Sequence, residues 1–148
     1  MQALLGERKL QRVVADPRAA SRLMQAAERH LAAASVAAEV DRDGAYSLAY
    51  DAARKSAVAL LAQQGLRPTA RGGHYAVVRV MEAQFPGVEG LSSMDRLRRR
   101  RNEVEYPDLE AYDAVDDSEV QEAIAVAGRC LASARRLLDE GGLVPFPD

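Results

Sequence analysis

Residues 45–64, AYSLAYDAARKSAVALLAQQ, form the stretch that decides the fold. Alanine recurs along this stretch and β-branched residues are few, a composition that favours a helix over a strand. Its small side chains permit close approach of neighbouring helices, while its leucines supply larger core volume. Gly65 and Pro68 follow, and a glycine and a proline just past a helical pattern mark its end. The stretch therefore predicts a long helix packed closely against other helices.

Two segments nearer the ends of the chain also have the spacing of long helices. The first opens with Asp16, a good N-cap, and Pro17, a good first helical residue, and continues to about Val40. The second is capped by Ser118 and ends near Asp139. Apolar residues step by three and four along both segments, so each is predicted to bury one face. These residues are Ala20, Leu23, Ala27, Leu31, Ala34 and Ala38 in the first segment, and Val120, Ile124, Ala127, Leu131, Ala134 and Leu138 in the second.

Shorter helical patterns fill most of the remaining chain. One covers residues 74–85 and ends at a Pro-Gly pair, another covers residues 94–105 ahead of Pro107, and a third covers residues 4–14. The loops between the patterns are mostly short, as in antiparallel helical proteins. The predicted fold class is all-α: an antiparallel four-helix bundle with one short extra helix and a candidate N-terminal helical arm.

The composition fits one domain with an ordinary core, since 48% of the 148 residues are hydrophobic and 28% are charged. We expect a single domain over residues 1–148, with residues 1–15 as the candidate arm and residues 141–148 as a tail, either docked or frayed. One cysteine excludes an internal disulfide, and two histidines with one cysteine cannot build a closed zinc site. Because no signal-type or membrane-spanning apolar run is found, we expect a cytoplasmic protein without a membrane partner. We also expect neither a metal nor a cofactor.

Five of the six residues from 96 to 101 are arginine, although the net charge of the chain is −2. On the predicted helix Arg101 falls on the apolar side, where a guanidinium normally has a carboxylate partner or an anionic ligand. Asp51 of the alanine-rich stretch is a candidate for that partner and would orient Arg101. The neighbouring arginines are predicted to form a solvated face that suits nucleic-acid phosphates. They are Arg98, Arg99 and Arg100.

Three segments together resemble a domain of the HEPN superfamily: LAYDAARKSAVALLAQQGLRP at residues 48–68, GGHYAVVRVMEAQFPG at residues 72–87, and RNEVEYP at residues 101–107. The resemblance implies a four-helix bundle, typically dimeric. It places the family's arginine at Arg101 and the polar residue after it at Asn102. For nuclease members, it also implies a metal-independent RNA cleavage site where two copies meet. In toxin–antitoxin systems such domains are the toxin half, so an antitoxin such as a nucleotidyltransferase is an implied partner.

The sequence leaves more than one function open. Tyr106 stands where the family motif has a histidine, and an ordinary phenol titrates near pH 10, which suits proton transfer at neutrality poorly. One hypothesis is an RNA-binding or RNA-cleaving protein that uses Arg101, Asn102 and Tyr106. The alternative is a non-catalytic helical module that dimerises and binds an acidic partner or nucleic acid, and a third is that Arg101 merely pairs with Asp51. His74 is interpreted as a helix cap or a locally packed residue, His30 as a surface or partly packed residue, and Cys130 as a small buried residue, and the sequence leaves the roles of all three open.

Overall fold

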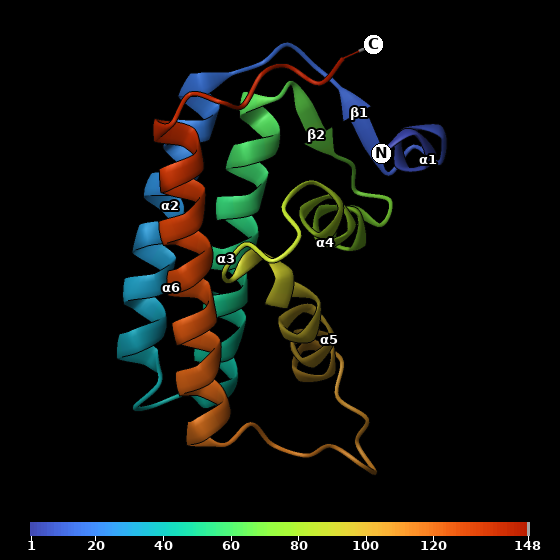
Figure 1. Cartoon of the computed structure of the whole chain (residues 1–148). Coiled ribbons are helices and arrows are strands. Elements are labelled where there is room, and N and C mark those ends of the chain that lie inside the picture. The colour runs from blue at the N-terminus through green and yellow to red at the C-terminus, as the bar shows by residue number, and fades with distance from the viewer. Residues whose placement is uncertain (148) are drawn as a thin grey trace.

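The computed structural model describes residues 1–147, and its fold is mostly helical. Three long helices lie side by side: α2 (Pro17–Ala37), α3 (Arg42–Gln63) and α6 (Asp117–Asp139) (Figure 1). Helix α3 packs against both others and is enclosed on most sides, which explains why it needs small residues all around it. Its buried alanines are Ala45, Ala49, Ala52, Ala53, Ala57 and Ala59.

Carboxylate caps begin all three long helices. Asp16 Oδ1 accepts a hydrogen bond from the Ala19 amide at 2.9 Å, and Asp41 does the same for Gly44. Asp116 and Glu119 form a reciprocal capping box at the start of α6. Two expected boundaries were therefore wrong by a few residues: α3 begins before residue 45, and the cap of α6 is an aspartate two positions ahead of the expected serine.

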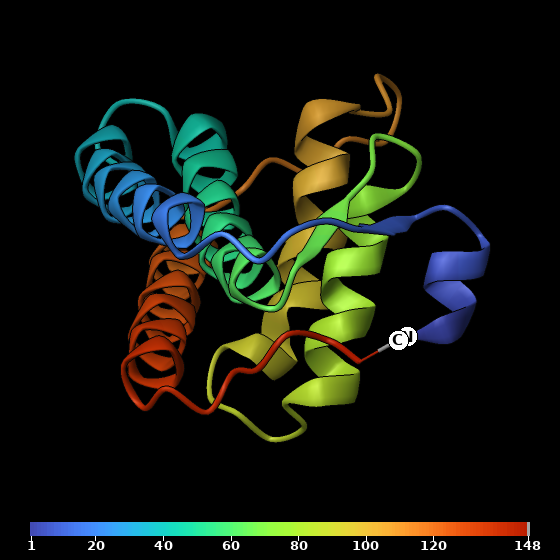
Figure 2. The same cartoon turned by 90° about the horizontal axis from the view of Figure 1, so that it is seen from above.

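Two shorter helices pack on the other side of α3. Helices α4 (Gly73–Gln84) and α5 (Met94–Glu105) lie next to each other when the molecule is seen from above (Figure 2). The short 3₁₀ turn η1 (Leu91–Ser93) leads into α5. Their buried faces complete one continuous core with α3, and the prediction of an all-α helical bundle is confirmed. The buried residues of this pair include Val77, Val78, Val80, Met81, Met94 and Leu97.

The expected helix over residues 4–14 was wrong. Only α1 (Gln2–Gly6) is helical there, and β1 (Leu10–Arg12) pairs antiparallel with β2 (Leu66–Pro68). Arg8 has a φ of 56°, a left-handed conformation that ends a helix, and its carbonyl accepts a hydrogen bond from the Thr69 hydroxyl at 2.7 Å. Leu10 is buried in the core, so this segment packs against the helices.

The C-terminal tail is docked in extended form as far as it is described. The Phe146 amide donates to the Gln64 carbonyl at 2.9 Å, and the Arg12 guanidinium donates to the Phe146 carbonyl at 3.1 Å. The tail therefore covers the end of α3 beside the two-stranded sheet, and both chain ends lie on the same side of the molecule (Figure 1). Within residues 1–147, no helix combines the length and the hydropathy that a bilayer span requires.

Candidate functional site

Arg101 lies on the side of α5 that faces α3. Its side chain is 21% exposed, and its Cζ atom lies 5.7 Å from the centre of the Tyr50 ring, within cation–π distance. The nearest carboxylate is Glu105, whose Oε1 is 3.9 Å from the arginine Nε, and that oxygen also accepts a hydrogen bond from Ser47 at 2.7 Å. The Arg101 Nε is buried without a hydrogen-bond partner in the described chain. The positive charge of Arg101 is therefore only weakly compensated.

The expected ion pair between Asp51 and Arg101 is not formed within residues 1–147. Successive helical residues point about 100° apart, and Tyr50, not Asp51, is the residue of α3 that meets Arg101. The Asp51 carboxylate still acts at longer range: burial lowers the pKa of both His30 and His74, and the negative charge of Asp51 offsets part of this lowering. The suggestion that Arg101 serves only in a structural pair with Asp51 was thus wrong.

Tyr50 joins Arg101 to a residue of a third helix. Its hydroxyl lies 2.9 Å from Nδ1 of His74, at the start of α4, and the two rings are inclined by only 18°. Burial raises the pKa of Tyr50 to about 12, so the phenol keeps its proton at neutral pH. Burial also lowers the pKa of His74, and the positive charges of Arg54 and Arg101 lower it further. The imidazole is therefore neutral at pH 7.

Arg54 is the second weakly compensated cation at this place. It lies one helical turn after Tyr50 on α3, and its charge acts on the pKa of both Tyr50 and His74. The Arg54 Nε is buried, and the side chain forms neither a hydrogen bond nor an ion pair within the part of the chain that is described. We call Tyr50, Arg54, His74 and Arg101 the arginine–histidine cluster. Two enclosed guanidiniums with so little negative charge nearby create a strong local attraction for an anion.

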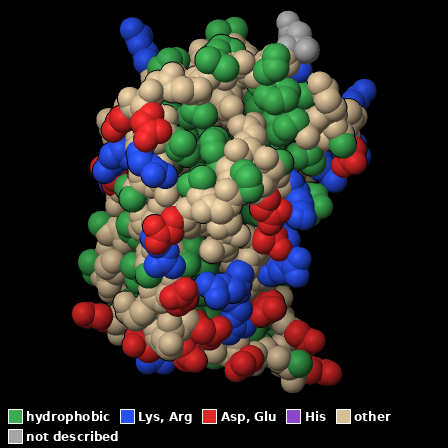
Figure 3. Space-filling view, in the orientation of Figure 1, with side chains coloured by type: hydrophobic (Ala, Val, Ile, Leu, Met, Phe, Trp, Pro, Cys, Tyr) green, Lys and Arg blue, Asp and Glu red, His purple; other side chains and the backbone are tan. Residues whose placement is uncertain are grey.

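Of the three arginines expected to form a solvated face, only Arg99 is exposed, whereas Arg98 and Arg100 are partly buried. Arg98 donates two hydrogen bonds to Asp95, at 3.0 and 2.9 Å, and its Cζ lies 5.7 Å from the ring centre of Tyr75. Arg99 also pairs with Asp95, but its side chain is 73% exposed. Acidic and basic side chains alternate over the surface near the end of α5 (Figure 3). The basic run is therefore mostly neutralised by neighbouring carboxylates.

Arg100 is structural rather than available for a ligand. Its side chain is 15% exposed, bonds to Glu119 at 3.0 Å and to Glu103 at 2.7 Å, and donates to the Asp113 carbonyl at 2.8 Å. These bonds tie α5 to the first turn of α6, and they account for its strongly raised pKa. The expected contact of Arg100 with nucleic acid stays a prediction, and the geometry does not favour it because the five donors of Arg100 are largely used within the chain.

Asn102 and Tyr106 lie on the exposed side and end of α5. The Tyr106 side chain is 80% exposed, and within residues 1–147 no hydrogen bond or ring contact joins it to the arginine–histidine cluster. Tyr106, which the resemblance matches to the motif histidine, is therefore turned toward solvent, whereas the histidine on which the Arg101 charge acts is His74 of α4. From the sequence, His74 was expected to cap a helix or pack locally, with its role left open, and Tyr50 and Arg54 were not among the expected site residues. The one sequence signal that could have pointed to Arg54 is its place as an arginine inside an alanine-rich helix.

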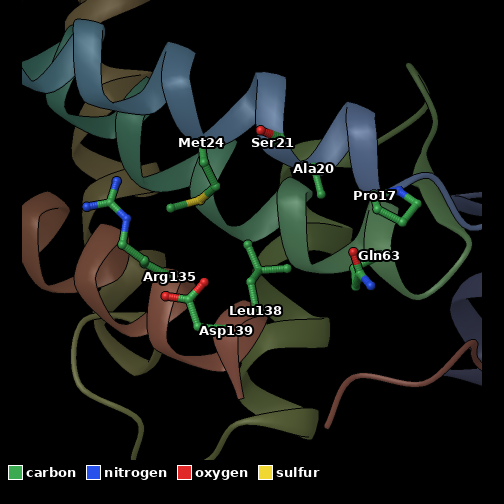
Figure 4. Close-up of a pocket in the computed structure, with 8 residues that line it drawn as sticks. All are labelled: Pro17, Ala20, Ser21, Met24, Gln63, Arg135, Leu138 and Asp139. Carbon is green, nitrogen blue, oxygen red and sulfur yellow. The ribbon is translucent and has the colours of Figure 1, made fainter. Parts of the chain in front are cut away.

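A separate hollow lies at the other end of the bundle. It is bordered by the start of α2 and the end of α6, with Gln63 of α3 beside them (Figure 4). Gln63 is 13 positions after Tyr50, which is roughly 20 Å along a helix. Arg135 at its edge forms an ion pair with Glu28. This hollow shares no residue with the cluster and offers no comparable unpaired charge. Within residues 1–147, no three His, Cys, Asp or Glu side chains gather as metal ligands would.

Comparison with known proteins identifies the domain. A family model of the HEPN domain matches residues 20–140, a range that includes every residue of the arginine–histidine cluster. No curated protein and no solved structure matches the chain.

Proposed function

Because the chain belongs to the HEPN domain family, whose members are associated with ribonucleases and toxins, we propose that it binds RNA through Arg101 and cleaves it without a metal ion. The observation that carries this proposal is the state of Arg101: enclosed, with Nε lacking a hydrogen-bond partner and the nearest carboxylate 3.9 Å away. A guanidinium matches a phosphate with two parallel hydrogen bonds. An RNA phosphate would supply the anion that the fold itself does not provide.

The roles of the motif residues follow from their positions. Arg101 binds the scissile phosphate and stabilises the negative charge that develops on it in the transition state. Asn102 is adjacent and exposed, so its amide is available to hydrogen-bond the RNA backbone. Tyr106, at the exposed end of α5, serves as an accessory hydrogen-bond donor. Arg99 is exposed and paired with Asp95, so it is not assigned a contact with the phosphate.

The partners proposed are a second copy of the chain, RNA, and an antitoxin. HEPN domains commonly dimerise and pair with nucleotidyltransferases. A homodimer that brings two copies of α5 together would place the exposed Asn102 and Tyr106 of each copy near the other copy's Arg101. We propose that the protein is the toxin half of a bacterial toxin–antitoxin or defence system, with a nucleotidyltransferase as the antitoxin.

The test is a gel assay with a mixed pool of structured and single-stranded RNAs in EDTA. The wild-type protein is expected to retard the RNA and to cleave it, whereas Arg101→Ala loses cleavage and weakens binding about tenfold or more, since a charged hydrogen bond is worth about 1.5–3 kcal/mol. Arg99→Ala is the matched control, because it removes the same charge from the same helix at a side chain that is 73% exposed. It is expected to stay within about threefold of wild type.

Each outcome of the assay has a defined meaning. Loss of binding that is equal in the two variants would show that only the general charge of α5 matters, and would contradict a specific role for Arg101. Binding without cleavage would support the non-catalytic module in place of the nuclease. Absence of both signals in the wild-type protein would overturn the proposal.

A further inference from the structure

We propose that Arg54 and His74 are functional residues of the same RNA site: Arg54 binds the phosphate together with Arg101, and His74 takes the proton from the attacking 2′-hydroxyl. This inference rests on the proposed function and adds two residues that lie outside the motif at the end of α5. It also extends the site from the exposed end of that helix to the place where α3, α4 and α5 contact one another. Three observations carry it.

The first observation is the unpartnered state of Arg54. An arginine in a partly buried position of a folded domain almost always has a carboxylate partner, because an unpaired enclosed charge is costly. Arg54 has none within residues 1–147, and its Nε is buried without a hydrogen bond. Arg101 shows the same feature on the facing helix. Two guanidiniums arranged this way are suited to clamp one phosphate from two sides.

The second observation is the orientation of His74. Its Nδ1 is held 2.9 Å from the Tyr50 hydroxyl, and Tyr50 is itself fully buried on α3. The ring is therefore fixed by a residue that cannot move far. The other ring nitrogen, Nε2, has no hydrogen-bond partner within the described chain, and the residue is only partly buried. An imidazole anchored at one nitrogen and open at the other is the usual arrangement of a proton-transfer group.

The third observation is the charge around His74. Arg54 and Asp51 of α3 and Arg98 and Arg101 of α5 act on it, and the arginines together with burial lower its pKa. The free imidazole is neutral at pH 7, which is the form that accepts a proton. A bound phosphate would offset part of the arginine charge and stabilise the imidazolium that forms during the reaction.

The reaction balances without a further reagent besides water. His74 Nε2 accepts the proton of the ribose 2′-hydroxyl while that oxygen forms a bond to phosphorus, and the Nδ1–H group keeps its proton and donates a hydrogen bond to the Tyr50 oxygen. The bond from phosphorus to the 5′-oxygen breaks, and this oxygen takes a proton from solvent water. The products are a 2′,3′-cyclic phosphate and a 5′-hydroxyl end. The imidazolium then returns its proton to solvent.

The test measures RNA binding and cleavage separately for variants at the two positions. His74→Asn removes the titrating ring and is expected to lower the cleavage rate about 100-fold or more while binding stays within about threefold. Arg54→Gln is expected to weaken binding about tenfold. Wild-type cleavage is expected to fall as the pH drops through the pKa of His74, below 6.5, and this acid limb is absent in His74→Asn. Retained RNA binding shows that the histidine variant is folded.

Tyr50→Phe serves as the variant for the positioning role. It removes the hydroxyl that anchors His74 and keeps the ring beneath Arg101, so it is expected to shift the acid limb of the pH profile and to leave binding unchanged. If His74→Asn cleaves at the wild-type rate while Arg101→Ala does not, the proposed function stands and the role of His74 is overturned. Wild-type protein that binds without cleaving also overturns it. Unaltered binding by Arg54→Gln overturns the shared phosphate site.

Discussion

Replacing Gly90 with alanine is expected to lower the free energy of unfolding by about 4 kcal/mol. Gly90 has a φ of 83°, where an L side chain is strained. A Cβ atom there would lie 2.4 Å from the Cys130 amide nitrogen and 2.7 Å from the Arg129 carbonyl carbon, so the turn before α5 would have to move away from α6. Urea denaturation measures the change.

Gly87→Ala is the matched control for this variant. Its φ is 73°, nearly the same, but apart from its two chain neighbours no atom of the described residues lies within 4 Å of the position that a Cβ would take. It is expected to cost only the backbone strain, about 1–2 kcal/mol. Equal losses in the two variants would show that the close approach of Gly90 to α6 is unimportant. The comparison matters for function, since η1 and the turn before it set the position of α5 and of Arg101.

Replacing Arg101 with methionine is expected to raise the free energy of unfolding by about 1 kcal/mol and to abolish RNA cleavage. Methionine keeps most of the aliphatic volume against Tyr50 but removes a guanidinium whose Nε is buried without a partner. The lost cation–π contact, worth about 0.5–1 kcal/mol, offsets part of the gain. Thermal and urea unfolding of the wild-type protein and of Arg101→Met measure the sign of the change in the free energy of unfolding.

The sign distinguishes a functional arginine from a structural one. A residue kept for binding is expected to lower the free energy of unfolding of the ligand-free protein, so its replacement stabilises. Breaking a structural ion pair would instead destabilise the protein by several kcal/mol. Arg100→Met provides the internal comparison, because Arg100 is bonded to Glu119 and Glu103 and its loss must be destabilising. A similar loss of stability in both variants would contradict the account of Arg101.

The helices could be predicted from the sequence because their signals are local. Caps such as Asp16, the three-and-four spacing of apolar residues, and glycine or proline at the ends all act within a few positions. The β1–β2 pair could not be predicted in the same way. Residues 10–12 are too short to show alternation, and their partners lie more than fifty positions away in the sequence.

The site was only partly predictable for a related reason. Spacing on one helix placed Arg101 on the enclosed side of α5, and it also made Asp51 an attractive partner. Which residue of α3 meets α5 depends on the rotation of one helix against the other, and a shift of one position exchanges Asp51 for Tyr50. His74 enters through the packing of α4, and no local pattern connects it with Arg101.

The most direct test of a phosphate site at the arginine–histidine cluster is a titration of protein labelled with ¹⁵N-arginine by a short single-stranded RNA, followed through the arginine Nε–H signals. The Arg54→Gln, Arg99→Ala and Arg101→Ala variants assign the three signals of interest. The account predicts large, saturable shifts of the Arg54 and Arg101 signals and little change at Arg99. Binding of RNA that moves the Arg99 signal and leaves those of Arg54 and Arg101 in place would contradict it.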